Sequence, residues 1–341
     1  MDPVGSSERA TGSITDVPGI EVGNAQNAEA LTGCTVVLMR KGAVAGADVR
    51  GGAPGTRETD LLNPINLVDK AHAILLAGGS AFGLDAASGV MRYLEERGIG
   101  FNTGTVKVPI VPAAIIFDLN LGSSRIRPDA EMGYQACAAA TKNPPAEGNA
   151  GAGTGASVGK LFGMSLAMKS GLGSASVKAG GTVVGALVAV NAIGDILDPK
   201  TGAIVAGLRS GRVGPVRVGR GDYFADTFES MKKPLGSGIL GLATRANTVV
   251  GVVATNAKLT KAQATKVAQM AQDGVARAVR PAHTMLDGDT IFALSTGNKN
   301  VNVTIVGSLA AQAIADAIVR AVKMAEGAGG LPGLRSSINA D

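Results

Sequence analysis

Short apolar runs alternate with amphipathic segments along most of this chain, and this alternation restricts its fold more than any other feature. The run from His72 to Ala77 is typical of a buried strand, and residues 81–96, which Gly98 closes, are typical of a helix. A strand at 113–117 and a helix at about 129–141 follow. The pattern predicts a mixed α/β (α+β) fold, and the 49 glycines indicate that strands and helices approach each other closely.

The second half of the chain continues this pattern. Strands are expected at 174–178, 183–190 and 290–294, and residues 194–206 predict a hairpin whose turn is 198–202. Thr260 and Gln263 have the spacing of a capping box for a helix that Pro281 ends, and Ser308 is expected to cap a last helix over 309–326. The pattern weakens at about 208–246, which predicts a loose linker, and residues 1–12 predict a flexible leader.

Charge and composition exclude several classes of protein. The formal net charge is +5, but the basic residues are scattered and only 3% of residues are aromatic, so no nucleic-acid partner is expected. The N-terminus lacks the apolar core of a signal peptide, and the apolar stretch 183–197 is too short to span a bilayer. Cys34 and Cys137 are expected to be free buried thiols. These features predict a cytoplasmic protein with no membrane partner.

The glycine-rich segment from Gly151 to Lys160 allows two interpretations. It imitates a phosphate-binding loop, but that motif needs Ser or Thr after the lysine, where this chain has Leu161. The residues before it, 143–150, include prolines and polar groups where a dinucleotide-binding fold has a strand. The alternative is a turn that packs on a sheet and carries Lys160 to a reaction centre, where its charge becomes useful.

Few residues offer acid–base chemistry. Of the two histidines, His72 is expected in the core or at a strand edge, and His283 lies near Asp287 and Asp289. One histidine and two carboxylates on a short loop make a weak metal site, so no metal and no cofactor are expected. Spacing alone leaves the two aspartates as solvated turn residues or as acids that hold an ammonium. It likewise leaves Asn191 as a turn former or an oxyanion donor.

A hydroxyl stands at the start of a predicted buried strand, because Asn247 and Thr248 precede the apolar run from Val249 to Ala254. A threonine hydroxyl is a weak nucleophile at neutral pH and needs a base. One known base is the α-amine of the same threonine when that residue begins a chain. Thr248 is internal, so this chemistry requires cleavage between Asn247 and Thr248.

Several segments resemble one family in the family's own order, over nearly the whole chain. They are residues 50–62, 76–87, 109–118, 151–160, 247–256 and 287–290. They resemble the P1 family (S58) of self-cleaving peptidases, the L-aminopeptidase/D-esterase group that includes the nylon-oligomer (6-aminohexanoate-oligomer) hydrolases. The resemblance implies a four-layer αββα sandwich of the type shared with ornithine acetyltransferase, similar to the N-terminal nucleophile hydrolases but distinct from them in topology.

The resemblance also implies roles for single residues. Thr248 matches the nucleophile that autocleavage after Asn247 frees, and Thr after Asn is similar to the nylon-oligomer hydrolases. The other residues that their pattern places in the same centre are Lys160, Asn191, Asp287 and Asp289. Phe117 departs from the family, whose members can carry Tyr there, so any phenol contact to an oxyanion must come from elsewhere.

The resemblance further implies what cleavage produces and what the product does. An α fragment, 1–247, and a β fragment, 248–341, are expected to form one domain, in a homo-oligomer of cleaved protomers, a tetramer or larger. The expected activity is hydrolysis of amide bonds in small oligoamides of 6-aminohexanoate or in short peptides. Alternatives are an aminopeptidase or esterase that releases N-terminal residues, an acyltransferase resembling ornithine acetyltransferase, and a nucleotide-binding protein.

Overall fold

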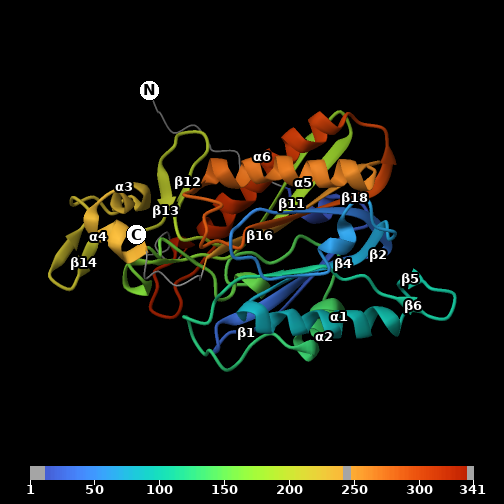
Figure 1. Cartoon of the computed structure of the whole chain (residues 1–341), viewed down its shortest axis with the longest axis horizontal. Coiled ribbons are helices and arrows are strands. Elements are labelled where there is room, and N and C mark those ends of the chain that lie inside the picture. Colours follow the sequence, from blue (N-terminus) through green and yellow to red (C-terminus); the bar gives the residue numbers. More distant parts are fainter. Residues whose placement is uncertain (1–11, 241–246, 336–341) are drawn as a thin grey trace.

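A nine-stranded sheet forms the centre of this computed structural model, which describes residues 12–240 and 247–335 (Figure 1). Neighbouring strands are antiparallel except in the pairs β16–β18 and β4–β7. In spatial order the strands are β10 (Leu172–Ala179), β11 (Thr182–Asn191), β16 (Thr248–Ala257), β18 (Thr290–Lys299), β2 (Thr32–Val49), β4 (Lys70–Ala77), β7 (Ala113–Ile115) and β3 (Thr56–Arg57), and β1 (Glu21–Asn27) also pairs with β2.

The long strand β2 divides this sheet into two half-sheets. Its residues 34–38 lie between β1 and β4, whereas residues 44–49 pair with β18. The register against β4 shifts between Leu38 and Ala43, where β2 changes partners. One half-sheet therefore holds β10, β11, β16 and β18, and the other holds β1, β4, β7 and β3.

Helices cover the outer faces of both half-sheets (Figure 1). The first half-sheet packs against α5 (Lys261–Ala278) and α6 (Val303–Lys323), and the second against α1 (Ala86–Glu95) and α2 (Ala130–Ala138). A third apolar cluster, which includes Leu76, Val252 and Phe292, joins the inner faces of the two half-sheets. These layers form the expected αββα sandwich.

The continuous apolar runs in the sequence arise because both faces of each central strand are buried. In β16, Val249 and Val253 face α5 and α6, whereas Val250 and Val252 face the other half-sheet. A strand needs alternating polar residues only where one of its faces meets water. The predicted strands and the predicted free, buried state of both cysteines are confirmed.

Helix boundaries confirm one sequence prediction and correct two. Thr260 and Gln263 form the predicted capping box of α5. Asn302 caps α6 through its side chain, so Ser308 lies inside that helix and is not its cap. The helix predicted at 81–96 begins as the 3-10 turn Ser80–Asp85 and becomes α-helical only at α1. Local patterns located all three helices but gave the correct first turn only for α5.

By length and composition, α6 is the one helix in residues 12–240 and 247–335 that could cross a bilayer. In its most apolar window, 67% is buried inside the molecule. It contacts α5, β10 and β11, so it serves as a core helix of the sandwich.

The predicted linker is folded over residues 208–240, whereas residues 241–246, like the leader up to residue 11, lie outside the described residues. It forms the hairpin β14 (Gly211–Val213) and β15 (Val216–Val218) and the helices α3 (Thr227–Met231) and α4 (Pro234–Leu240).

Asp195 anchors residues 208–240, because its buried carboxylate accepts from Leu208 N at 2.8 Å and from Thr227 N and Oγ1 at 2.6 and 2.7 Å. Asp195 begins β12 (Asp195–Leu197), which pairs with β13 (Ile204–Ala206) as the predicted hairpin and with β17 (Val279–Arg280).

Lys169 is fully buried, at 0% exposure, and holds the loop that leads to Lys160. Its ammonium donates to Gly153 O at 3.1 Å, to Ala156 O at 2.9 Å and to Ser170 O at 2.5 Å. Burial lowers the pKa of Lys169 to about 7, and the negative charge of Asp118 opposes this shift. Three carbonyl acceptors match the three hydrogens of an ammonium, which further favours the charged form. The short pair β8 (Ser157–Val158) and β9 (Met168–Lys169) keeps the lysine beside this loop.

Replacing Lys169 with Met is expected to lower the free energy of unfolding by about 2–4 kcal/mol, because buried carbonyls lose a charged donor and Asp118 loses a positive neighbour. Lys142→Met, at an exposed lysine, is the matched control and should change it by less than about 0.5 kcal/mol. Urea unfolding measures both values. Equal stability of wild type and Lys169→Met would show that this ammonium does not support the loop.

Candidate active site

Thr248, the first residue of β16, lies directly opposite Asn191, the last residue of β11, in the antiparallel pairing. Thr248 is 4% exposed and Asn191 is 0% exposed. The strand ends therefore place a hydroxyl and an amide side by side in a region closed to water. The predicted junction of Asn247 and Thr248 is buried on both sides of the peptide bond.

Asn191 connects the end of β11 to the glycine-rich segment. The Lys160 ammonium donates to Asn191 Oδ1 at 2.9 Å and to its backbone O at 2.8 Å. The backbone N–H of Ser157 donates to the same Oδ1 at 3.1 Å. The Asn191 Nδ2 donates to Phe117 O at 2.9 Å. Because Nδ2 carries two hydrogens, its bond to Phe117 O does not by itself exclude an oxyanion role for Asn191.

The glycine-rich segment itself is a buried turn packed on the sheet. A Cβ added to Gly151 would lie 2.2 Å from Thr35 Oγ1, and one added to Gly153 would lie 2.1 Å from Leu172 N. Ala152, between them, is fully buried. A phosphate-binding loop presents its backbone N–H groups to a ligand, whereas this backbone lies against β2 and β10. The geometry favours the packed turn over the nucleotide-binding alternative.

The amine of Lys160 titrates close to neutral pH. Burial lowers its pKa to about 7, and the negative charges of Asp287 and Asp118 oppose the shift. The two oxygens of Asn191 that accept from it stabilise the protonated form. A group that exchanges its proton near pH 7 is suited to acid–base work at physiological pH.

Asp289 holds the backbone immediately after the junction. Its Oδ1 accepts from Val249 N at 2.7 Å, and its Oδ2 accepts from His283 N at 3.0 Å. His283 Nδ1 also lies 2.9 Å from this Oδ2. Spacing suggested His283 only as a weak metal ligand, whereas in the structure it is a hydrogen-bonding partner of Asp289.

Asp287 is buried next to the same carboxylate. Burial and the charge of Asp289 raise the pKa of Asp287 to about 6, while hydrogen bonds from Thr284 and the charge of Lys160 oppose the rise. Its Oδ2 accepts from Thr284 N at 2.7 Å and from Thr284 Oγ1 at 2.5 Å. Since Asp287 and Asp289 are 2% and 1% exposed, they are not solvated turn residues.

The segment 50–53 braces this acidic loop. Arg50 N and Gly51 N donate to Asp289 O at 2.9 and 3.2 Å, and Ala53 N donates to Asp287 O at 2.8 Å. A Cβ on Gly51 would lie 2.2 Å from Asp287 O, so only glycine allows this approach. The family-like segment 50–62 thus holds Asp287 and Asp289 in place.

The carbonyl oxygen of Asn247 has two donors. Thr248 Oγ1 donates to it from one side. Gly288 N donates to it at 3.0 Å. A Cβ on Gly288 would lie 2.9 Å from Ala53 O and 3.0 Å from Thr248 Oγ1, so the close approach depends on glycine. Sequence reasoning missed Gly288, although a glycine between two site acids was a signal for it.

A narrow cavity of about 10 Å³ borders this centre. Lys160 and Ser157 are among its lining residues. Its apolar lining residues are Phe117, Leu121 and Met164. A cavity of this size holds about one water. The phenylalanine that departs from the family pattern therefore adds apolar surface where a tyrosine would add a hydroxyl.

Asp118 is a further buried acid that sequence reasoning did not single out. Its oxygens accept from Gly79 N and from Thr32 Oγ1, both at 2.7 Å. Burial raises the pKa of Asp118, and these bonds oppose the rise. Its charge acts on both buried amines, Lys160 and Lys169. Only the position of Asp118 in a family-like segment, directly after Phe117, was a signal for it.

This chain is similar to known proteins over nearly its whole length. The model of peptidase family S58 matches residues 12–335. An uncharacterised aminopeptidase of Mycobacterium tuberculosis (strain ATCC 25618 / H37Rv) is 44% identical and covers 95% of this chain and 97% of its own. The 6-aminohexanoate-oligomer endohydrolase of Kocuria sp. (strain KY2) is 32% identical and covers 92% of this chain and 88% of its own.

Solved structures share the fold. The beta-aminopeptidase of Burkholderia sp. superposes with a TM-score of 0.65 at 25% identity, over 98% of this chain and 93% of its own. The L-aminopeptidase D-Ala-esterase/amidase of Ochrobactrum anthropi, described as a variant of the Ntn hydrolase fold, gives 0.67 at 20% identity, over 94% and 88%. The family match from residue 12 to residue 335, with relatives of this similarity, shows that the chain belongs to peptidase family S58 and is a hydrolase.

Proposed function

We propose that this chain is an amide hydrolase that activates itself by cleavage between Asn247 and Thr248 and then acts through an acyl-enzyme on Thr248. One observation carries the proposal: the Thr248 hydroxyl and the Gly288 N–H both donate to the Asn247 carbonyl. A nucleophile and an oxyanion donor thus already meet at the bond to be broken.

The proposed cleavage step uses these atoms. Thr248 Oγ1 bonds to the Asn247 carbonyl carbon while the Gly288 N–H stabilises the developing oxyanion. The C–N bond then breaks and the Oγ1 proton passes to the departing nitrogen, which leaves an ester between the two residues and a free α-amine on Thr248. Water hydrolyses the ester to give the Asn247 carboxylate.

Turnover uses the same atoms on a substrate. The α-amine freed on Thr248 has a reference pKa of about 7.7–8.0, so it can take the proton of its own hydroxyl near neutral pH. The Gly288 N–H stabilises the substrate oxyanion, and one such donor is worth about 3 kcal/mol in studied hydrolases. Asn191 joins it through its side-chain amide, which carries two N–H donors. Lys160 polarises the centre, and Asp287 and Asp289 hold ammonium groups.

The small size of the site supports the proposal that the uncleaved chain is an inactive precursor. The cavity of about 10 Å³ beside Lys160 is too small for an amide substrate. The Asn247 carbonyl occupies the position in which Thr248 and Gly288 would meet a substrate carbonyl. Cleavage would let Asn247 leave and open this position.

The proposed substrates are small oligoamides of 6-aminohexanoate or short peptides. The set Thr248, Lys160, Asn191, Asp287 and Asp289 favours the oligoamides, and the relative from Kocuria sp. carries that activity in its name. Release of N-terminal residues from peptides, amides or esters is the second candidate, because relatives at 43–44% identity are named aminopeptidases.

Removing the hydroxyl tests the first step. Thr248→Ala is expected to remain a single chain without hydrolase activity, because neither processing nor acyl transfer has a nucleophile. Thr248→Ser keeps the hydroxyl and should be cut at the same bond. Intact mass spectrometry of freshly purified wild type should give fragments 1–247 and 248–341. A single uncut wild-type chain with full activity, or normal processing of Thr248→Ala, contradicts the proposal.

The acids and the amine predict a pH dependence. We expect kcat/KM to fall as the pH drops through about 7.7–8.0, where the freed α-amine of Thr248 takes up a proton and can no longer act as the base, and to fall further through about 6, where Asp287 loses the charge that holds an ammonium. Lys160→Met removes the positive charge that favours the Asp287 carboxylate, so the pKa of Asp287 should rise above about 6. Carbon-13 NMR of the carboxyl group measures this pKa.

The matched control for that pH experiment is Lys258→Met, an exposed lysine beyond the opposite end of β16. It should leave the pKa of Asp287 unchanged. A lower or unaltered Asp287 pKa in Lys160→Met would mean that the two groups do not interact as the geometry indicates.

Parallel assays separate the two substrate classes. We expect the cleaved protein to hydrolyse linear 6-aminohexanoate oligomers with a higher kcat/KM than an aminoacyl p-nitroanilide. Product sizes by liquid chromatography and mass spectrometry distinguish internal cleavage from release of terminal units. The reverse ranking, with single N-terminal residues released, would assign the chain to the aminopeptidase alternative.

A further inference from the structure

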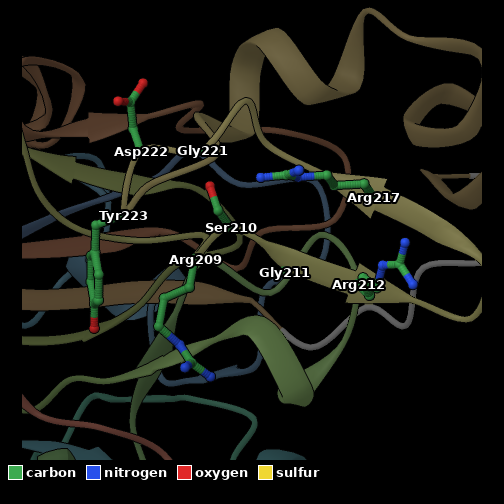
Figure 2. Close-up of a pocket in the computed structure, with 8 residues that line it drawn as sticks. All are labelled: Arg209, Ser210, Gly211, Arg212, Arg217, Gly221, Asp222 and Tyr223. Carbon is green, nitrogen blue, oxygen red and sulfur yellow. The ribbon is translucent and has the colours of Figure 1, made fainter.

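An arginine-lined cavity of about 440 Å³ lies on the hairpin β14–β15, outside the candidate active site (Figure 2). Its lining includes Arg209, Arg212 and Arg217 but only one acid, Asp222. Across residues 12–240 and 247–335, none of these four residues takes part in an ion pair. The cavity therefore concentrates positive charge that the described protein does not balance.

Arg212 and Arg217 are direct cross-strand partners in this hairpin. Like charges at directly opposite positions destabilise an antiparallel pair. A bound anion would weaken that repulsion, and Arg217 is the arginine placed to donate to it, because in Figure 2 its side chain extends toward Gly221 whereas the Arg212 side chain extends away from it. The hairpin should therefore be more stable with a negatively charged ligand bound than without one.

A buried hydroxyl points to the same ligand chemistry. Ser210 Oγ is buried without a hydrogen-bond partner in the described part of the chain, although Ser210 N donates to Tyr223 O at 2.9 Å. In Figure 2 the Ser210 hydroxyl and the Arg217 guanidinium both extend toward Gly221. Arg217 Nη2 lies 3.8 Å from where a Cβ on Gly221 would be. A hydroxyl and a guanidinium that converge in this way are donors suited to an oxyanion.

Arg209 joins this cavity to the candidate active site. Its Nε donates to Ala167 O at 3.2 Å and its Nη2 donates to Ser165 O at 2.7 Å. These carbonyls belong to the turn that begins at Met164, which lines the small cavity beside Lys160. The segment 164–167 therefore lines the small cavity through Met164 and holds Arg209 of the larger cavity through its carbonyls.

We propose that this cavity binds the free carboxylate end of a linear oligoamide or peptide through Arg217 and Ser210. The proposal rests on the proposed function, since a linear amide substrate carries one carboxylate and each hydrolysis creates another. Guanidinium groups pair with carboxylates in a bidentate manner. The Tyr223 ring, in a residue that is 60% exposed, offers an apolar surface for methylene groups, and the cavity has the volume of a small-molecule site.

Binding is tested first, without catalysis, by calorimetric titration of the purified full-length protein with adipate, a dicarboxylate that has no amide. We expect adipate to bind, 1,6-hexanediol not to bind, and Arg217→Gln to weaken adipate binding about tenfold or more, as the loss of one charged donor does. The control is Arg220→Gln, which removes the same charge from an exposed arginine that does not line the cavity. It should bind adipate like wild type.

Two results would overturn the carboxylate assignment. If Arg217→Gln and Arg220→Gln weaken adipate binding equally, the effect comes from the overall positive charge of the region and not from Arg217. Inorganic phosphate that binds as tightly as adipate would make this an unselective anion site. Unchanged thermal melting of both variants establishes that each is folded.

Kinetic measurements then test whether the cavity recognises the carboxylate end of the substrate. For wild type, a linear 6-aminohexanoate trimer should have a lower KM than the same trimer capped as its methylamide, and Arg217→Gln should abolish that difference while Arg220→Gln preserves it. Equal KM values for both trimers in wild type would contradict the proposal. If neither trimer is hydrolysed, the proposed function fails, and the adipate titration still decides whether the carboxylate site exists.

Discussion

The pairing of β16 with β11 on one side and with β18 on the other is the constraint on which the candidate site depends. The antiparallel register sets Thr248 against Asn191, and the parallel register sets the start of β18 beside the start of β16. Asn247 forms a bridge with Asp287 just beyond these strands, which brings the Gly288 N–H to the Asn247 carbonyl. A shift of one residue in either pairing would turn Thr248 to the opposite face and separate these groups.

Buried charge is the second constraint, because burying a charged group costs free energy unless a charge of opposite sign lies close to it. Lys160 and Lys169 are amines whose pKa values burial lowers, and Asp118 and Asp287 are acids whose pKa values burial raises. Each lies in the field of an opposite charge, which limits these shifts. As a result, the pKa values of Lys160 and Lys169 lie at about 7 and that of Asp287 at about 6, which suits acid–base chemistry near neutral pH.

The sequence predicted the strands and helices well, because strands buried on both faces leave continuous apolar runs and helices keep their own period, whereas the four-layer arrangement was implied by the family resemblance. It also led to Lys160, Asn191, Thr248, Asp287 and Asp289, whose meeting in space rested on ordered family-like segments and not on spacing. It did not reveal the change of partners within β2, the anchoring of residues 208–240 by Asp195, or the ammonium of Lys169. Those features depend on hydrogen bonds between residues far apart in the chain, which leave no local pattern.

The central claim is that Thr248 Oγ1 attacks the Asn247 carbonyl and forms an ester. Hydroxylamine tests it most directly, because this nucleophile cleaves esters and competes with water. When freshly translated precursor matures in hydroxylamine, the account predicts that the 1–247 fragment ends in an Asn247 hydroxamate, which mass spectrometry of its C-terminal peptide detects. A fragment that ends only in an unmodified Asn247 carboxylate, at the same rate of cleavage, would contradict an ester intermediate on Thr248.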